Sequence, residues 1–79
     1  MRARVTVMLK KGVLDPQGEA VKHALNSLDY DKVKSVRQGK VIEIVLDETS
    51  KIDANKRIQE MCEKLLANTV IESYEIEII

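Results

Sequence analysis

The junction between two different hydrophobic repeats constrains the fold of this chain most strongly. From Arg2 to Lys10 apolar and polar residues alternate, which is typical of a strand with one buried face. After Asp15 the apolar residues instead recur every three or four positions, as they do in an amphipathic helix. The segment 11–19, KGVLDPQGE, must therefore turn a strand into a helix within a few residues.

The residues of this junction suit such a turn. Gly12 tolerates a positive φ angle, Asp15 is a good N-cap, and Pro16 is favoured at the first helical position. Gly18 is the exception, because glycine inside a helix is about 1 kcal/mol less favourable than alanine. We therefore expect that the backbone at Gly18 needs access or a close approach by another group.

The middle of the chain predicts one helix and two strand segments. The helix begins after Asp15, ends near Asp29, and has an apolar stripe of Val21, Ala24, Leu25 and Leu28. Residues 33–36 form a weak strand pattern, and residues 41–46 form a strong one. Between them, Gln38-Gly39 fits either a tight hairpin turn or a glycine bulge in one long bent strand.

A second helix and a last strand follow. Ser50, with Asp53 three residues later, predicts the N-cap of that helix. Asn68 is a candidate left-handed C-cap, and the last strand runs from about Ile71 to Ile79. The stripe of this helix is expected to contain Ile58, Met61, Cys62 and Leu65, widened by Ala54 and Leu66.

The order β-α-β-β-α-β predicts a single α+β domain over residues 1–79. Short connections and right-handed crossovers favour a ferredoxin-like two-layer sandwich, with two helices on one face of an antiparallel sheet. This fold places the first and last strands side by side. Opposite charges on their outer faces agree with that placement: Arg2, Arg4, Lys10, Glu75 and Glu77.

A chain of 79 residues has little core to stabilise it. A single core of this size supplies about 3–5 kcal/mol, the lone Cys62 cannot form an internal disulfide, and no Cys/His cluster is present to hold zinc. We therefore expect a homodimer or homotetramer. The uncovered face of the sheet, which mixes Met8, Val41 and Val45 with charges, is expected to contact protein.

Composition argues against several classes of partner. The 13 basic and 13 acidic residues balance to a net charge of zero, and no Phe or Trp is present to stack bases, so we expect no nucleic acid. No apolar run is long enough to span a bilayer, so we expect no membrane partner. A lone thiol and the lack of a recognisable targeting segment predict a cytoplasmic location.

The sequence also predicts no catalytic, cofactor or metal site. His23 is the only histidine and lies on a polar helix face, with no nucleophile in register. Cys62 is expected to be buried and unreactive. A phosphate cradle over residues 12–18 is disfavoured, because Asp15 places a negative charge where the anion would bind and the loop has no arginine.

Three segments, taken in order, resemble the PurS family, the small subunits of phosphoribosylformylglycinamidine synthase. They are LKKGVLDPQG at 9–18, VRQGK at 36–40 followed by Ile42-Glu43, and LLANTVIE at 65–72. The family commonly has proline where Thr69 stands, a difference that affects only that turn. The resemblance covers essentially the whole chain.

The resemblance implies a non-catalytic accessory subunit in purine biosynthesis. In the family, a PurL-type synthetase uses ATP and magnesium, a PurQ-type glutaminase releases ammonia, and PurS oligomers bridge them. No cofactor is then expected in this chain. The motif residues and the open sheet face together give the expected protein contacts: Asp15, Pro16, Gln17, Gly18, Arg37, Lys40, Met8, Val41 and Val45.

Two other classes of function stay open on the sequence. One is a stand-alone ferredoxin-like domain that senses a small molecule through its open sheet or helix ends. The other is a minor enzyme that uses the loop of residues 12–18. Binding of an amino acid or nucleotide to the isolated domain would favour the sensor, whereas capture by a glutaminase and a large synthetase would favour the assembly role.

Overall fold

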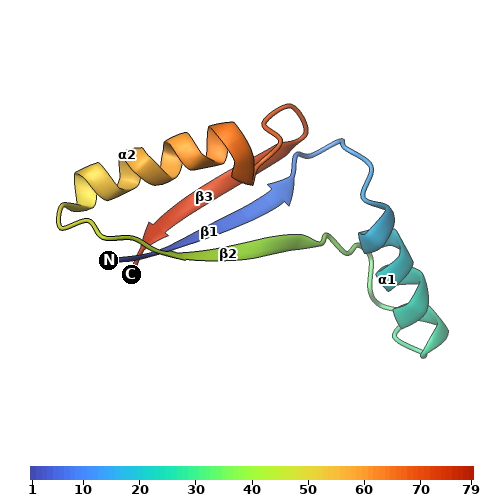
Figure 1. Cartoon of the computed structure of the whole chain (residues 1–79). Coiled ribbons are helices and arrows are strands. Elements are labelled where there is room, and N and C mark those ends of the chain that lie inside the picture. Colours follow the sequence, from blue (N-terminus) through green and yellow to red (C-terminus); the bar gives the residue numbers. More distant parts are fainter.

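The computed structural model describes residues 1–79 as three strands and two helices (Figure 1). In chain order these are β1 (Arg2–Leu9), α1 (Pro16–Ser27), β2 (Gly39–Val45), α2 (Lys51–Met61) and β3 (Glu72–Ile78). A π-helical segment, η1 (Cys62–Leu66), continues α2 without a break. No helix combines the length and the apolar character needed to cross a membrane.

β1 is the central strand of an antiparallel sheet with the order β2-β1-β3. Val5 lies opposite Ile42 on one side and Ile76 on the other. The inward side chains of β1 are fully buried: Ala3, Val5 and Val7. The predicted alternation of the first strand and its placement beside the last strand are both confirmed.

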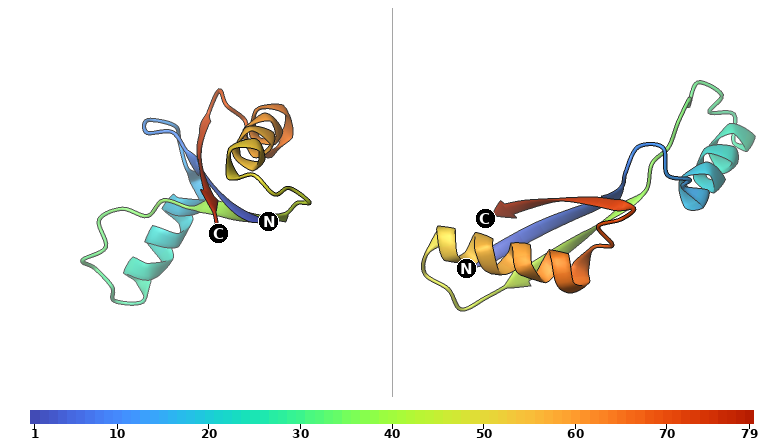
Figure 2. Two further views of the ribbon diagram at one scale, coloured as in Figure 1. Left: turned by 90° about the vertical axis from the view of Figure 1, so that its left-hand side faces the viewer. Right: turned by 90° about the horizontal axis from the view of Figure 1, so that it is seen from above.

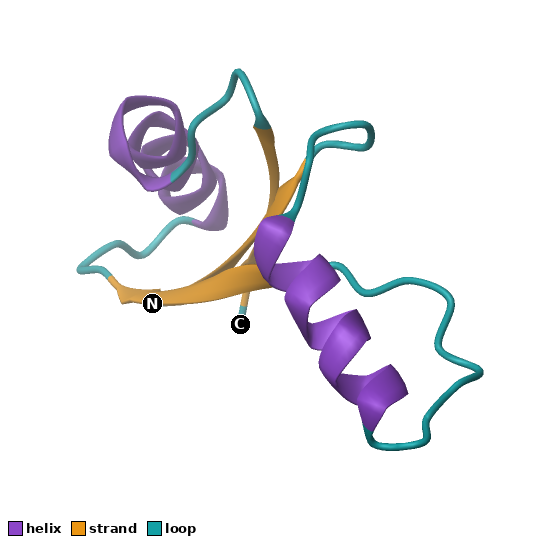
Figure 3. Cartoon of the chain, turned by 90° about the vertical axis from the view of Figure 1, so that its right-hand side faces the viewer, coloured by secondary structure: helices purple, strands orange, loops and turns teal.

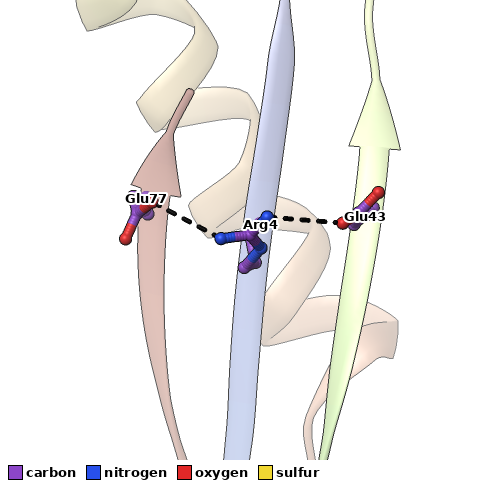
Figure 4. Close-up of polar contacts among 3 residues, drawn as sticks. All are labelled: Arg4, Glu43 and Glu77. Carbon is purple, nitrogen blue, oxygen red and sulfur yellow. Dashed lines mark ion pairs between the residues drawn. The ribbon is translucent and has the colours of Figure 1, made fainter.

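Arg4 connects the three strands on the outer face of the sheet (Figure 4). Its guanidinium nitrogens lie 3.5 Å from a Glu43 carboxylate oxygen on β2 and 3.7 Å from one of Glu77 on β3. The predicted pairing of basic and acidic residues across the strands is therefore confirmed at Arg4. All three side chains are largely exposed, so each pair contributes only about 0–1 kcal/mol, and the effect is mainly on strand register.

The inner face of the sheet is covered by α2 and η1. Three fully buried side chains at intervals of four residues make the contact: Ala54, Ile58 and Cys62. Ser50 caps α2, since its side-chain oxygen accepts a hydrogen bond from the Asp53 amide at 3.3 Å. The predicted N-cap is confirmed, as are Ala54, Ile58 and Cys62 of the predicted stripe. Met61 was also placed in that stripe, and this was wrong, because its side chain is exposed.

The π-helical turn changes which side chains at the end of this helix meet the core. The Ala67 amide donates to the Cys62 carbonyl, five residues earlier, at 3.1 Å. A π turn holds an extra residue and so rotates the following side chains around the helix axis. Leu66 and Ala67 therefore pack on the core while Leu65 is 83% exposed, and the placement of Leu65 in the buried stripe was wrong.

The α+β class, the antiparallel sheet and the two helices are confirmed, but three details differ from the sequence expectation. Residues 33–36 form no strand, so Gln38-Gly39 is neither a hairpin turn nor a bulge, and Gly39 simply begins β2. α1 does not cover the sheet but projects from its end, beside the loop that follows it (Figures 2 and 3). Asn68 is not a left-handed cap. That conformation is found at Asp29, with φ of 73°, where α1 was predicted to end.

The projecting α1 gives the chain an elongated shape. The radius of gyration is 16.0 Å, against about 11.6 Å for a compact domain of this length. The principal extents are 49 × 24 × 14 Å. The buried core is accordingly confined to β1, α2, η1 and Ala67, together with the half-buried residues of β2 and β3.

We predict that Cys62→Ala lowers the free energy of unfolding by about 1 kcal/mol, because a small cavity replaces a fully buried side chain. Leu65→Ala, in the same segment but exposed, should change it by less than about 0.5 kcal/mol. Urea unfolding of both variants tests this. Rapid labelling of the native thiol by a bulky reagent would contradict the burial.

Candidate functional site

The segments that leave β1 and that return to β2 meet at one place, which we call the Asp15 corner (residues 9–18 and 36–40). The corner begins with a turn in which Gly12 has φ of 87°, as its glycine predicts. It then starts α1, with Pro16 at the first helical position. Two of the three segments that resemble the PurS family, residues 9–18 and 36–40, therefore lie together.

The Asp15 carboxylate bonds to both sides of this corner. Oδ1 accepts from the Gly18 amide at 2.9 Å, which is the predicted N-cap. Oδ2 accepts from the Gln38 amide, also at 2.9 Å, across 23 positions of sequence. The first bond confirms the N-cap that the sequence predicted. No feature of the sequence indicated that the Gln38 amide would be the second donor.

Gly18 is buried because the returning chain passes directly over it. A Cβ at this position would lie 2.4 Å from the Val36 carbonyl oxygen and 2.5 Å from Asp15 Oδ2. The expected close approach at Gly18 is therefore confirmed, and the group that approaches is the chain itself. The glycine is explained without a partner molecule.

Further side-chain bonds hold the corner in place. The Arg37 guanidinium donates to the Leu9 carbonyl, and Gln38 Nε2 donates to Gln17 Oε1 at 3.0 Å. Lys10 Nζ donates to the Thr69 carbonyl at 2.8 Å, which ties the end of β1 to the turn before β3. The orientation of α1 is thus set by contacts at its N-terminal end.

The corner borders a shallow depression of about 250 Å³, lined mainly by polar residues. Asp15, Pro16, Gln17 and Lys40, four of the expected contact residues, lie on its wall beside Glu72. Gly18 and Arg37 lie close behind through the bonds described above. The mixture of two carboxylates with one lysine offers hydrogen bonds to a protein surface rather than a pocket for an anion.

The remaining expected contact residues are on the outer sheet face and do not join the corner. Val41 lies opposite Thr6, and Met8 lies opposite Gly39. Val41 and Met8 are therefore both near the end of the sheet that adjoins the corner. Val45 lies opposite Arg2 at the other end, roughly 13 Å along the strand from Val41. The structure therefore divides the nine predicted residues into two surfaces.

Two titratable groups outside the corner have shifted pKa values. Burial, and then the nearby Glu63 charge, raise the pKa of the Cys62 thiol, which keeps it protonated. The Tyr74 hydroxyl donates to Glu63 at 2.8 Å, and this hydrogen bond raises the pKa of Tyr74. The Glu63–Tyr74 contact was not predicted from sequence. No three His, Cys, Asp or Glu side chains gather as metal ligands would.

Comparison with known families gives one match over nearly the full chain. The sequence model of the family described as PurS, phosphoribosylformylglycinamidine (FGAM) synthase, matches residues 2–79. The chain is 51% identical to the PurS subunit of Bacillus subtilis, with 98% of this chain and 90% of that protein covered. It is 43% identical to the PurS subunit of Methanocaldococcus jannaschii, with 98% and 93% covered.

Solved structures agree with these sequence matches. The B. subtilis PurS structure has a TM-score of 0.86 at 51% identity, with 96% of this chain and 94% of that chain covered. A chain in the structure of PurLQS from Thermotoga maritima has a TM-score of 0.87 at 32% identity, with 96% and 93% covered. The elongated fold with its projecting helix is thus shared with experimentally determined structures.

We predict that Gly18→Ala destabilises the corner, because a methyl group 2.4 Å from a backbone oxygen forces either α1 or the returning chain to move. The expected cost is about 1–3 kcal/mol, the usual range for overpacking. Hydrogen exchange at the Gln38 amide is the measurement. His23→Ala, an exposed change in the same helix, is the control, and equal protection in Gly18→Ala and wild type would contradict the packing.

Asp15 also predicts a dependence of stability on pH. The Gln38 amide, the Gly18 amide and the Arg37 charge hold the pKa of the Asp15 carboxyl below its ordinary value of 3.8. The stabilisation is therefore complete above that ordinary value and is lost as pH falls through the lowered folded-state pKa. Unfolding followed between about pH 5 and pH 2 should show a steeper loss in wild type than in Asp15→Asn, and parallel curves would contradict this.

Proposed function

Because the chain belongs to the PurS family of FGAM synthase subunits, we propose that it is the small, non-catalytic subunit of such a synthase in de novo purine biosynthesis. In this role it bridges a PurQ-type glutaminase and a PurL-type synthetase and supports the transfer of ammonia between them. The observation that carries the proposal is the match to named PurS subunits over almost the entire chain.

The chemistry of the proposed complex is divided among its subunits. The glutaminase hydrolyses glutamine to glutamate and ammonia, and the synthetase uses ATP and magnesium to place that ammonia on formylglycinamide ribonucleotide. Ammonia that escapes into water is lost to the reaction, so holding the two enzymes together has a direct effect on yield. This chain needs no cofactor for such a role.

The distribution of polar groups supports a role in assembly. The one histidine, His23, is exposed and its side chain has no hydrogen-bond partner, and the one thiol is buried. The Asp15 corner, by contrast, is a hydrogen-bonded polar surface that presents Pro16, Gln17 and Lys40 around a depression. We propose that this corner contacts one of the partner enzymes, and that the complex operates in the cytoplasm.

Self-association is the second part of the proposal. Only eight of the 79 residues are buried, while large apolar side chains on α1, on the outer sheet face and near η1 are exposed. A chain of this size gains stability by burying such side chains against another copy. A homodimer or homotetramer is therefore the proposed form.

Reconstitution from separate subunits tests the function. We predict that a glutaminase and a synthetase of this system lose their glutamine-dependent activity without this chain, while activity supplied with free ammonia persists. Adding the chain should restore glutamine use. Undiminished glutamine-dependent activity in its absence would overturn the proposal.

Two variants separate assembly from catalysis in the same assay. Gln17→Ala and Lys40→Ala together should raise the concentration of this chain that gives half-maximal activity, because both side chains line the corner. His23→Ala, on an exposed helix face, should titrate like wild type. Loss of activity at saturating His23→Ala would mean that the chain contributes a catalytic group.

A further inference from the structure

The Asp15 corner is basic, although the chain as a whole is neutral. The corner lies where the sheet gives way to α1 (Figure 1), and its residues 9–18 and 36–40 contain one acidic side chain, Asp15, and four basic ones: Lys10, Lys11, Arg37 and Lys40. Residues 41–79 have the opposite balance, with four basic and nine acidic side chains. Positive charge is therefore concentrated at one place on the molecule.

The chain does not neutralise this positive charge itself. The one carboxylate of the corner, Asp15, accepts hydrogen bonds from the amides of Gly18 and Gln38. All four basic side chains of the corner are exposed. The ion pairs of the chain are formed elsewhere, on the outer sheet face and on α2: Arg4 with Glu43 and Glu77, and Arg57 with Glu60. The corner therefore offers unpaired cations to another molecule.

Two of these cations are held in position. The Arg37 guanidinium donates to the Leu9 carbonyl, and Lys10 Nζ donates to the Thr69 carbonyl. A neutral carbonyl group orients a cation but leaves its positive charge in place. An anionic partner therefore meets charges that are already oriented, and less side-chain entropy is lost when it binds.

A hollow of about 490 Å³ beside the Gly12 turn gathers these charges with apolar groups. Its wall also includes the half-buried side chains of Val13 and Val36 and the carboxylates of Asp15 and Glu19. Three of the four cations of the corner lie on the same wall: Lys10, Lys11 and Arg37. Cations beside apolar side chains suit a binding segment that combines carboxylates with an apolar residue.

Two features favour a protein segment over other anions. Single-stranded nucleic acids are held by aromatic stacking as well as by charge, and the corner contains no aromatic side chain. A small anion such as phosphate binds the free amides at a helix N-terminus, but here the amides of Gly18 and Gln38 already donate to Asp15.

We propose that the basic hollow of the Asp15 corner binds an acidic segment, with at least one apolar side chain, of one of the two partner enzymes. This inference rests on the proposed function and names the chemistry of the surface that the corner contacts. Complementary charge speeds the encounter and orients it. The excess of acidic side chains in residues 41–79 repels the same segment, so the partner is directed to the corner.

Graded charge changes at Lys11 are the first test, because this exposed side chain lines the hollow and makes no hydrogen bond or ion pair within the chain. One unit of charge about 6 Å from a carboxylate in water changes an association rate by a factor of about three. Lys11→Gln should therefore slow association with the partner about threefold, and Lys11→Glu about tenfold. The glutaminase and the synthetase are each measured at low ionic strength.

Lys56→Glu is the matched control for these variants. Lys56 is exposed on α2, away from the corner, so this substitution makes the same change in net charge and should associate like wild type. The wild-type rate should fall as salt is added, and the rate of Lys11→Glu should fall less steeply, because one attraction that salt screens is gone. Equal slowing by Lys56→Glu and Lys11→Glu would contradict a contact at the corner.

Competition is the second test and identifies the kind of anion. A glutamate-rich peptide with one leucine should displace the partner enzyme, and the same peptide with glutamine in place of glutamate should not. Inorganic phosphate at equal ionic strength should also fail to displace it. Displacement by phosphate, or displacement by single-stranded RNA at lower concentration than by the peptide, would overturn the proposal.

Coupling with a water-soluble carbodiimide is the third test and locates the acidic segment. The reagent joins a lysine amine to a nearby carboxylate as an amide, with loss of water. Mass spectrometry of the coupled complex should find Lys11 joined to an Asp or Glu of one partner enzyme. Coupling of the partner through Lys56 but not through Lys11 would contradict the assignment.

The outcomes distinguish this inference from the proposed function. Lys11→Glu should recover full glutamine-dependent activity at saturating concentration, since the contact acts on assembly, and activity that stays low at saturation would overturn the inference. A complex that uses glutamine while both Lys11 variants associate like wild type overturns the inference and leaves the bridging role standing. Glutamine-dependent activity that does not need this chain overturns the bridging role and the contact together.

Discussion

The carboxylate of Asp15 determines where the projecting helix lies. One oxygen caps α1 through Gly18, and the other binds the Gln38 amide, so a single side chain closes an excursion of 23 positions between β1 and β2. Closing a flexible loop of that length costs conformational entropy, and the bond to Gln38 offsets part of it. This bond therefore acts together with the Gln38–Gln17 bond and the Arg37–Leu9 bond to fix the direction of the helix relative to the sheet.

The sequence predicted those parts of the structure that depend on residues close together in the chain. The alternation of residues 2–10 gave the central strand, and Asp15 and Ser50 were correctly identified as helix caps, because each depends on residues close in sequence. The end of α1 close to Asp29 was likewise predicted from neighbouring residues. The side-by-side placement of β1 and β3 followed from the expected topology and from their complementary charges.

The predictions that were wrong or missing concern interactions between residues far apart in sequence, or a turn that rotates the side chains of a helix around its axis. No pattern near Asp15 indicates that Gln38 supplies its second hydrogen bond, and no pattern near Leu65 signals the π turn that moves this residue into solvent. The alternation of residues 33–36 did not form a strand because nothing in the single chain pairs with it. Of the predicted contact residues, those of the Asp15 corner lie together in the structure, and only the fold revealed that Val45 lies apart from them.

The position of β1 at the centre of the sheet affects the order in which the chain can fold. Its residue Ala3 pairs with Ile78, so β1 finds its second neighbour only after α1, β2 and α2 have been synthesised. Contacts that span nearly the whole chain are slow to form, and a ribosome-bound fragment lacking β3 would leave one side of β1 unpaired. The unpaired β1 edge is therefore exposed to wrong partners until β3 is available.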